Sequence, residues 1–434
     1  MTQSLRRAVG FALVASLSLS APVLGRAAAV PFAVVALVAF VVTEGPLFEL
    51  FAYPWDRQEE RLDTLLGFAL AATGLGVLVP LFDLPVGVYV ATLLAVGYGD
   101  LGRVVARRYA PSEVAGATGF ATLGFVAAFA GRVVTATLLG EPLLRPEYAF
   151  LAASGALLAG LLRAVFTDRD DPLILVSVAL LLWLFADLAV AVTWTRVVVA
   201  LGVTILFGYI SYALGAASGA GMLTGVFLAL LAVVLGDYGW FAVLVTFFGV
   251  GALATKYHYE EKKERGVAEE NAGARGSGNV LGNSAAALLA LLLFAASPRL
   301  PVDGAVFRFA FCASVATALA DTLSSEIGGL YGPPRLITTL EEVDPGTDGG
   351  VTWQGEVAGL AGAALIALLA WLLLPLSLLG AAVVVVGGFA GMTADSLAGA
   401  LIEGDVVGNQ AVNFLATATG GVVGGLLALA LGLV

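Results

Sequence analysis

Cysteine and histidine are almost absent from this sequence of 434 residues. There is one cysteine, Cys312, within a hydrophobic run, and one histidine, His258, among charged residues. A disulfide within the chain is therefore excluded, and a zinc site needs more such ligands than the chain has. A Ser-His-Asp arrangement is not expected either, because His258 stands in a charged, solvated segment.

Lysine is also scarce. Only three lysines occur, and the 21 basic residues are outnumbered by 32 acidic ones. This balance favours a cytoplasm rich in salt, where hydrated carboxylates keep proteins soluble, so we infer a halophilic habitat. Single exposed carboxylates are weak evidence of function in such a chain, and we expect no nucleic-acid partner.

Hydrophobic residues make up 60% of the chain, and the mean hydropathy is +0.98. Apolar runs of roughly 17–25 residues recur along its whole length, as an α-helix needs to cross a bilayer. Backbone groups in lipid must hydrogen-bond internally, so these runs predict helices. The predicted fold class is all-α, a polytopic integral membrane protein without a separate soluble domain.

About fifteen transmembrane helices are expected. The candidate spans are residues 8–24, 28–46, 62–80, 85–99, 115–138, 147–165, 172–192, 196–215, 219–236, 239–255, 279–297, 304–322, 355–374, 377–396 and 408–433. With the N-terminus inside, about fifteen basic residues fall on the inner side, as the positive-inside rule requires. This predicts a multi-pass protein of the cell membrane, with its two long loops on the cytoplasmic face.

The C-terminal half contains a repeated pattern. ADTLSSEIGG at residues 320–329 and ADSLAGALIEG at residues 394–404 each end a predicted span. VLGNSAAALL and VVGNQAVNFL each start one. The repeat predicts two related helical units, with Asp321, Asp395, Asn283 and Asn409 converging on one membrane face. An ionisable group within the bilayer costs about 2.5–3.5 kcal/mol on insertion scales, which makes it a sign of function.

Between these units lies the acidic, glycine-rich stretch ITTLEEVDPGTDGGVTWQGEVAG at residues 337–359. Its glycines can bring backbone N–H groups close to an anion, and it leads into a helix N-terminus that favours phosphate. Mg²⁺ would let carboxylates hold phosphate, because it bridges carboxylates and substrate phosphates. The candidate ligands are Asp321, Glu326, Asp344, Asp348 and Asp395, and the nearby cations are Lys256, Lys262, Lys263, Arg275 and Arg335. The alternative is a solvated acidic turn. The stretch is not a Walker A loop, since Gly-Lys-Ser/Thr is absent.

Residues 320–359 resemble the signature of a membrane family that contains transmembrane protein 19 and phytyl-phosphate kinase, also called domain of unknown function 92. The shared elements are Ala-Asp-Thr, Ser-Glu-Ile-Gly, Pro-Arg, Ile-Thr-Thr and Pro-Gly-Thr-x-Gly-Gly-Val, in that order. Segments such as GMTADSLAGALIEG also resemble the family, so the likeness covers about residues 200–434. Ser324 stands where the family usually has alanine.

The resemblance implies transfer of phosphate from CTP to an isoprenyl monophosphate, such as phytyl or geranylgeranyl phosphate, assisted by Mg²⁺ at the cytoplasmic face. Its partners would be the bilayer and a lipid substrate. The residues implied to be catalytic are Asp321, Asp348, Asp395 and Arg335, of which Asp321, Asp395 and Asp348 would hold the metal. The residues implied to bind substrate or nucleotide are Asn283, Ser325, Glu326, Gly346, Thr347, Gly349, Gly350, Ser396, Asn409 and Lys256.

The chain is thus predicted to have two parts. Residues 201–434 form the phytyl-phosphate-kinase-like part. Residues 1–200 form an N-terminal transmembrane region in which GYGDLGRVVARRYA weakly resembles a segment of phytol and dolichol kinases.

Two other functions stay open. Paired carboxylates and repeats also occur in transporters and channels, which place charges near the bilayer midplane. Clustering at one face favours an enzyme, although Arg132 falls within an apolar run. A lipid-phosphate cytidylyltransferase would use the same CTP and Mg²⁺.

Overall fold

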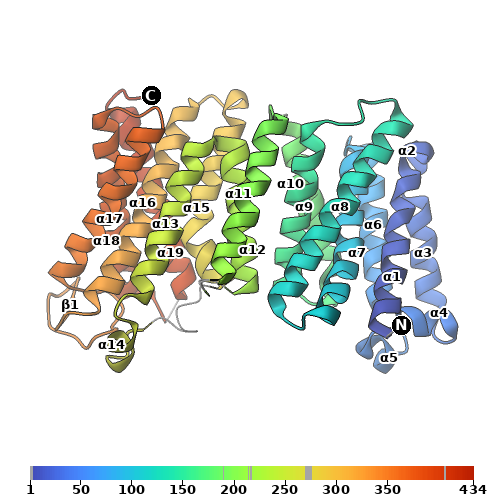
Figure 1. Cartoon of the computed structure of the whole chain (residues 1–434), viewed down its shortest axis with the longest axis horizontal. Helices are drawn as coiled ribbons and strands as arrows, with labels where there is room; N and C mark the ends of the chain where they lie inside the picture. The colour runs from blue at the N-terminus through green and yellow to red at the C-terminus, as the bar shows by residue number, and fades with distance from the viewer. Residues whose placement is uncertain (1–2, 189, 214, 216–217, 269–275, 405–406) are drawn as a thin grey trace. The chain divides into compact units, whose positions relative to one another are not determined.

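The computed structural model describes residues 3–188, 190–213, 215, 218–268, 276–404 and 407–434, almost entirely as helices (Figure 1). The chain divides into two compact units, Met1–Gly202 and Val203–Val434. The expected boundary after residue 200 lies beside this division. The two units are described separately.

Unit 1 is a helical bundle. Its elements are α1 (Gln3–Ser16), η1 (Leu17–Ser20), α2 (Ala21–Leu24), η2 (Gly25–Ala27), α3 (Val30–Val41), α4 (Pro46–Phe51), α5 (Pro54–Glu59), α6 (Asp63–Leu81), α7 (Val86–Tyr109), α8 (Glu113–Leu139), α9 (Pro146–Val165), η3 (Asp168–Asp170) and α10 (Asp171–Leu188). Helix α11 (Trp194–Ala213) spans the division between the units.

Unit 2 is a second helical bundle, with one short β-hairpin. Its helices are α12 (Gly219–Leu231), the π-helical turn η4 (Ala232–Gly236), α13 (Tyr238–Lys256), α14 (Tyr259–Glu264), α15 (Ser277–Ala296), η6 (Ser297–Arg299), α16 (Gly304–Gly328), α17 (Trp353–Leu373), α18 (Leu378–Ile402) and α19 (Asn409–Ala430). Strands β1 (Arg335–Leu336) and β2 (Gly350–Val351) pair antiparallel between α16 and α17.

Fourteen helical segments within the described residues are long and apolar enough to cross a membrane, which confirms the predicted class. The predicted span 28–46 differs, because its helix covers only Val30–Val41. Twelve residues reach about 18 Å, short of the roughly 30 Å hydrocarbon core. The helix ends where Val42 becomes extended, before Gly45 (φ 91°) and Pro46 start α4. One span fewer changes which loops lie on which side of the membrane, so a cytoplasmic N-terminus stays a prediction.

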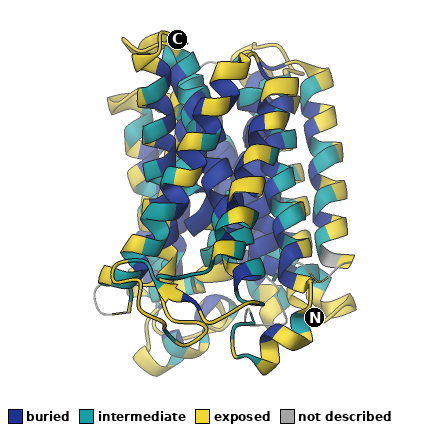
Figure 2. Ribbon diagram, turned by 90° about the vertical axis from the view of Figure 1, so that its left-hand side faces the viewer, coloured by how far each residue is buried: buried dark blue, intermediate teal, exposed yellow. Residues whose placement is uncertain are grey.

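The outward faces of the helices are apolar. Figure 2 shows buried residues in dark blue where helices meet and exposed residues in yellow on their outer faces. Many of the exposed side chains are large hydrophobic ones, such as Leu37, Ile205, Val386 and Leu426. Exposed apolar surface along long helices matches contact with lipid rather than water.

Helix α16 lies at the centre of unit 2, against α13, α15, α17, α18 and α19. Glycines bring the backbones of α16, α18 and α19 close together. A Cβ atom added at Gly420 would lie 2.0 Å from Thr317 Oγ1 and 2.9 Å from the Gly387 carbonyl oxygen. Small residues allow this approach in membrane helices, where packing replaces the hydrophobic effect. The C-terminal ends of α16 and α18 are thereby held next to each other.

We expect Gly420→Val to destabilise unit 2, because its side chain would overlap Thr317. The cost of such overpacking is about 1–3 kcal/mol or more. Thermal unfolding of the purified chain in detergent measures it. Gly249→Val on α13 is the matched control, since nothing lies within 4 Å of a Cβ there. Equal stability of the two variants would contradict the packing account.

Candidate functional site

A cavity of about 440 Å³ lies where the C-terminal ends of α16 and α18 meet the N-terminal ends of α15 and α19. We call it the acidic cavity. The segment 345–352 forms a further wall. Its polar lining residues are Thr255, Asn279, Asn283, Asp321, Thr322, Ser324, Ser325, Glu326, Tyr331, Thr347, Asp348, Thr352, Asp395, Ser396, Glu403, Asn409 and Asn413. The predicted convergence of the two helical repeats on one site is present in the structure.

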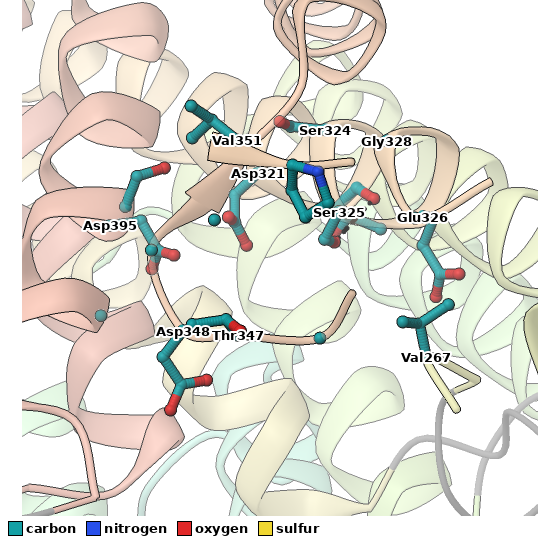
Figure 3. A pocket seen from close by; sticks show the side chains of 18 of the residues that line it. Val267, Asp321, Ser324, Ser325, Glu326, Gly328, Thr347, Asp348, Val351 and Asp395 are labelled. Atoms are coloured by element: carbon teal, nitrogen blue, oxygen red, sulfur yellow. Dashed lines mark hydrogen bonds between the residues drawn. The ribbon is translucent and has the colours of Figure 1, made fainter. Parts of the chain in front are cut away.

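Asp321 and Asp395 form a carboxyl pair at this convergence. Helices α16 and α18 each have 25 residues, and in each the aspartate stands seven residues before the helix ends. The two side chains face the same opening in Figure 3. The charges of the two side chains interact, and Asp395 Oδ1 is buried without a hydrogen-bond partner. Two carboxylates this close cannot both be charged unless a cation or a shared proton compensates them.

Four asparagines also line the cavity, in two matched pairs. Asn279 and Asn283 lie one turn apart on α15, and Asn409 and Asn413 lie one turn apart on α19. Within each pair the second amide donates to the first residue at 3.0 Å. The repeat is therefore Gly-Asn-x-x-x-Asn, and sequence analysis missed Asn279 and Asn413 by aligning Asn283 with Asn409. The spacing of four residues was the signal that could have found them.

The acidic, glycine-rich loop is fitted tightly against the helix ends. Gly346 (φ 84°) and Gly349 (φ 74°) take the left-handed conformation that glycine adopts readily. A Cβ at Gly349 would lie 2.6 Å from the Ser396 carbonyl oxygen on α18. Thr352 then caps α17 by accepting a hydrogen bond from the Gly355 N–H at 3.1 Å. The glycines of this loop therefore allow its turn and its close packing against α18, and they also line the cavity.

Glu326 is neutralised by Lys262, an ion pair that fastens α14 to α16. Lys262 Nζ lies 2.5 Å from Glu326 Oε2, and the lysine is 1% exposed. The same ammonium donates to the carbonyl oxygens of Ala254 and Thr255 at 2.9 and 2.8 Å. These are carbonyls of the last turn of α13, where a cation is favoured. Lys262 is thus fully engaged in the structure.

The structure brings most predicted site residues together and leaves out Arg335, Lys256 and Asp344. Asn283, Asp321, Ser325, Glu326, Gly346, Thr347, Asp348, Gly349, Gly350, Asp395, Ser396 and Asn409 all line the cavity. Arg335 does not, because it is exposed on β1 and pairs with Glu342 at 2.8 Å. Lys256 is not a lining residue either, and neither is the candidate ligand Asp344. Arg275 lies outside the described residues.

Asp348 is not assembled with the carboxyl pair. Its side chain points away from Asp321 and Asp395 in Figure 3. In the described part of the chain, no three or more Asp, Glu, His or Cys side chains are grouped closely enough to hold a metal ion. Of the three aspartates predicted to hold a metal, Asp321 and Asp395 are adjacent, whereas Asp348 lines the same cavity with its side chain directed away from them.

Glu403 is a further acidic lining residue, just after α18, that sequence analysis did not select. Burial, and then the carboxylates of Asp348 and Asp395, raise the pKa of its carboxyl group, whereas a hydrogen bond with Asn409 lowers it. No lysine or arginine is found among the lining residues in the described ranges. The cavity is therefore suited to a cation, or to an anion that arrives with one.

Residues 202–421 match the family model described as integral membrane protein DUF92. An uncharacterized membrane protein of Methanocaldococcus jannaschii is 38% identical over 200 residues, 44% of this chain and 76% of that protein. An uncharacterized membrane protein of Synechocystis is 39% identical over 138 residues, 32% of this chain and 52% of that one. Protein VTE6, chloroplastic, of Arabidopsis thaliana is 37% identical over 121 residues, 28% and 36% of the two chains. No solved structure matches.

We expect Lys262→Met to destabilise the protein, because it leaves Glu326 buried without its counter-charge. Breaking one side of a buried pair costs about 3–5 kcal/mol. Lys262→Met combined with Glu326→Gln should recover much of that loss. Lys263→Met, at an exposed neighbouring position, is the control. Thermal unfolding in detergent is the measurement, and a single variant as stable as the control would show that the pair is dispensable.

Proposed function

The chain belongs to the integral membrane protein DUF92 family, and from this premise we propose that unit 2 transfers a phosphate group from CTP to an isoprenyl monophosphate. The reaction class follows from the resemblance of residues 320–359 to phytyl-phosphate kinase. The choice of CTP and of a phytyl or geranylgeranyl chain rests on that resemblance alone. The reaction is proposed to occur at the cytoplasmic face of the cell membrane.

The observation that carries the proposal is the pair of Asp321 and Asp395 at matched positions of two repeated helices. Both stand seven residues before a helix end, about 10 Å along the axis. A transporter would place such groups nearer the bilayer midplane. A site close to the helix ends suits a substrate whose head group is polar and whose chain stays in lipid.

The donor set fits Mg²⁺, which prefers oxygen ligands from one or two carboxylates together with substrate phosphates. Asp321 and Asp395 would hold the ion, and the unpartnered Asp395 Oδ1 is an oxygen still available to it. When bound, Mg²⁺ would neutralise the phosphate oxygens during transfer.

The protein's own residues position the two phosphates. In the proposed reaction an oxygen of the lipid monophosphate forms a bond to the γ-phosphorus. The bond from the γ-phosphorus to the β–γ bridging oxygen breaks, and CDP leaves. Asn283 and Asn413, both buried, present amide N–H groups that can hold phosphate oxygens without adding charge. The turn at 345–350 forms one wall of the cavity.

Turnover by the purified full chain tests this proposal directly. We expect label from γ-³²P-CTP to appear in geranylgeranyl or phytyl phosphate in detergent with Mg²⁺. Asp321→Asn and Asp395→Asn should each lower the rate about 100-fold or more, equivalent to about 3 kcal/mol of transition-state stabilisation. Asp344→Asn, exposed in the same loop and outside the cavity, should retain activity.

Other outcomes of this assay identify the alternatives. Label released as pyrophosphate would indicate a cytidylyltransferase. Absence of turnover with any prenyl phosphate, together with solute flux in liposomes, would favour a transporter. Near-normal activity in both aspartate variants would exclude the proposed metal ligands.

The metal assignment makes a separate stability prediction. Mg²⁺ that binds only the folded state stabilises it by about 2.7 kcal/mol at 100 times its dissociation constant. We expect this gain in the wild type and its loss in Asp321→Asn and Asp395→Asn, measured by tryptophan fluorescence on heating. In EDTA the variants should be at least as stable as wild type, because like-charge repulsion is removed. A wild type that is indifferent to Mg²⁺ would argue against the site.

A further inference from the structure

Unit 1 contains a second cavity, of about 230 Å³, formed by α8, α9 and the end of α10. We call it the arginine cavity. Its polar lining residues are Arg132, Arg145, Glu147 and Tyr148, and its apolar lining residues are Phe150, Leu151, Phe185, Ala186, Val190 and Val192. The proposed kinase reaction uses none of them.

Arg132 is the unusual member of this set. It stands seven residues before the end of α8, inside a candidate membrane span. The structure makes room for its guanidinium at Gly87 on α7, where an added Cβ would lie 1.0 Å from Arg132 Nη1. Its Cζ lies 4.2 Å from the centre of the Tyr148 ring. Gly87 and the Tyr148 ring thus accommodate the charged Arg132 side chain within an apolar helix.

Two arginines and one glutamate line the cavity, so the lining carries a net positive charge, and the nearest further carboxylate, Glu141, accepts a hydrogen bond from Tyr148. Arg132 makes no ion pair within the described residues, and its Nε is buried without a hydrogen-bond partner. Arg145 Nε is paired only loosely with Glu147 Oε2, at 3.4 Å. Both α7 and α9 begin here, and helix N-termini add positive potential. An anion placed between the two arginines would complete the arrangement.

The remaining walls are hydrocarbon. Phe150 and Phe185 are nearly fully buried, with ring centres 5.2 Å apart. Leu151 and Val192 extend the same surface. A free inorganic anion would contact only the polar side of this cavity, whereas a lipid would place its head at the arginines and part of its chain along the apolar side.

We propose that the arginine cavity binds the phosphate head group of an anionic lipid between Arg132 and Arg145, with the adjoining hydrocarbon against Phe150 and Phe185. Arginine suits this role because its planar guanidinium donates two parallel hydrogen bonds to phosphate. The site is separate from the acidic cavity and does not depend on the function proposed for unit 2.

Native mass spectrometry of the full chain tests this proposal, with dioleoyl phosphatidic acid as the probe and dioleoyl phosphatidylcholine as the zwitterionic control. We expect phosphatidic acid to bind the wild type at least about tenfold more tightly than phosphatidylcholine. Arg132→Met and Arg145→Gln should each weaken phosphatidic acid binding about tenfold, since each removes a charge-assisted contact. Arg26→Gln, at an exposed position on η2 outside the cavity, should leave binding unchanged.

Arg145 is half exposed, so its variant decides the question even if Arg132→Met fails to fold. Equal binding of phosphatidic acid to wild type and Arg145→Gln would overturn the proposal. So would equal affinity for phosphatidylcholine. Inorganic phosphate that displaces the lipid at equal concentration would show that the hydrocarbon contributes nothing and would overturn the lipid assignment.

Discussion

The contact between Asp321 and Asp395 is the constraint on which the rest of unit 2 depends. Two carboxyl groups side by side repel when charged, so a flexible scaffold would let them separate. Here they are held by helices whose backbones meet at glycines, with Gly420 against Thr317 and Gly387. Close backbone packing leaves few alternative arrangements. The helices therefore preserve an electrostatically unfavourable geometry that a cation can relieve.

The loop after α16 is also held by close backbone packing. Gly349 fits against α18, Thr352 starts α17, and Gly355 packs on α16, where an added Cβ would lie 2.7 Å from the Ser324 carbonyl oxygen. The turn is thus anchored on both aspartate-bearing helices. Lys262 fixes the neighbouring segment by pairing with Glu326, which removes that carboxylate from the acidic set. The acidic residues around the cavity thus differ from one another: Glu326 is neutralised by Lys262, Asp321 and Asp395 form a pair, and the side chain of Asp348 is directed away from that pair.

The helices and the convergence of Asp321 with Asp395 could be predicted because both depend on local pattern. Apolar runs indicate membrane spans. A motif repeated at the same distance from the ends of two helices that run in the same direction places both aspartates at the same depth. Side-chain direction in the loop could not be predicted, since hairpin geometry turns Arg335 toward Glu342 and Asp348 away from the pair. The repeats on α15 and α19 were aligned in the wrong register, because α15 contains Gly-Asn twice, at Gly278-Asn279 and at Gly282-Asn283.

The absence of lysine and arginine among the described lining residues has a chemical consequence. A cavity lined by Asp321, Asp395 and Glu403 repels a free nucleoside triphosphate, and the asparagine amides offset little of the negative charge of these carboxylates. In the proposed reaction the nucleotide would therefore enter together with Mg²⁺ rather than ahead of it. The same reasoning explains the raised pKa of Glu403, because burial and neighbouring carboxylates disfavour its charged form until a cation is present. The proposed arginine-based anion site and the proposed carboxylate-based cation site thus lie in different units of this chain, each in the surroundings its charge requires.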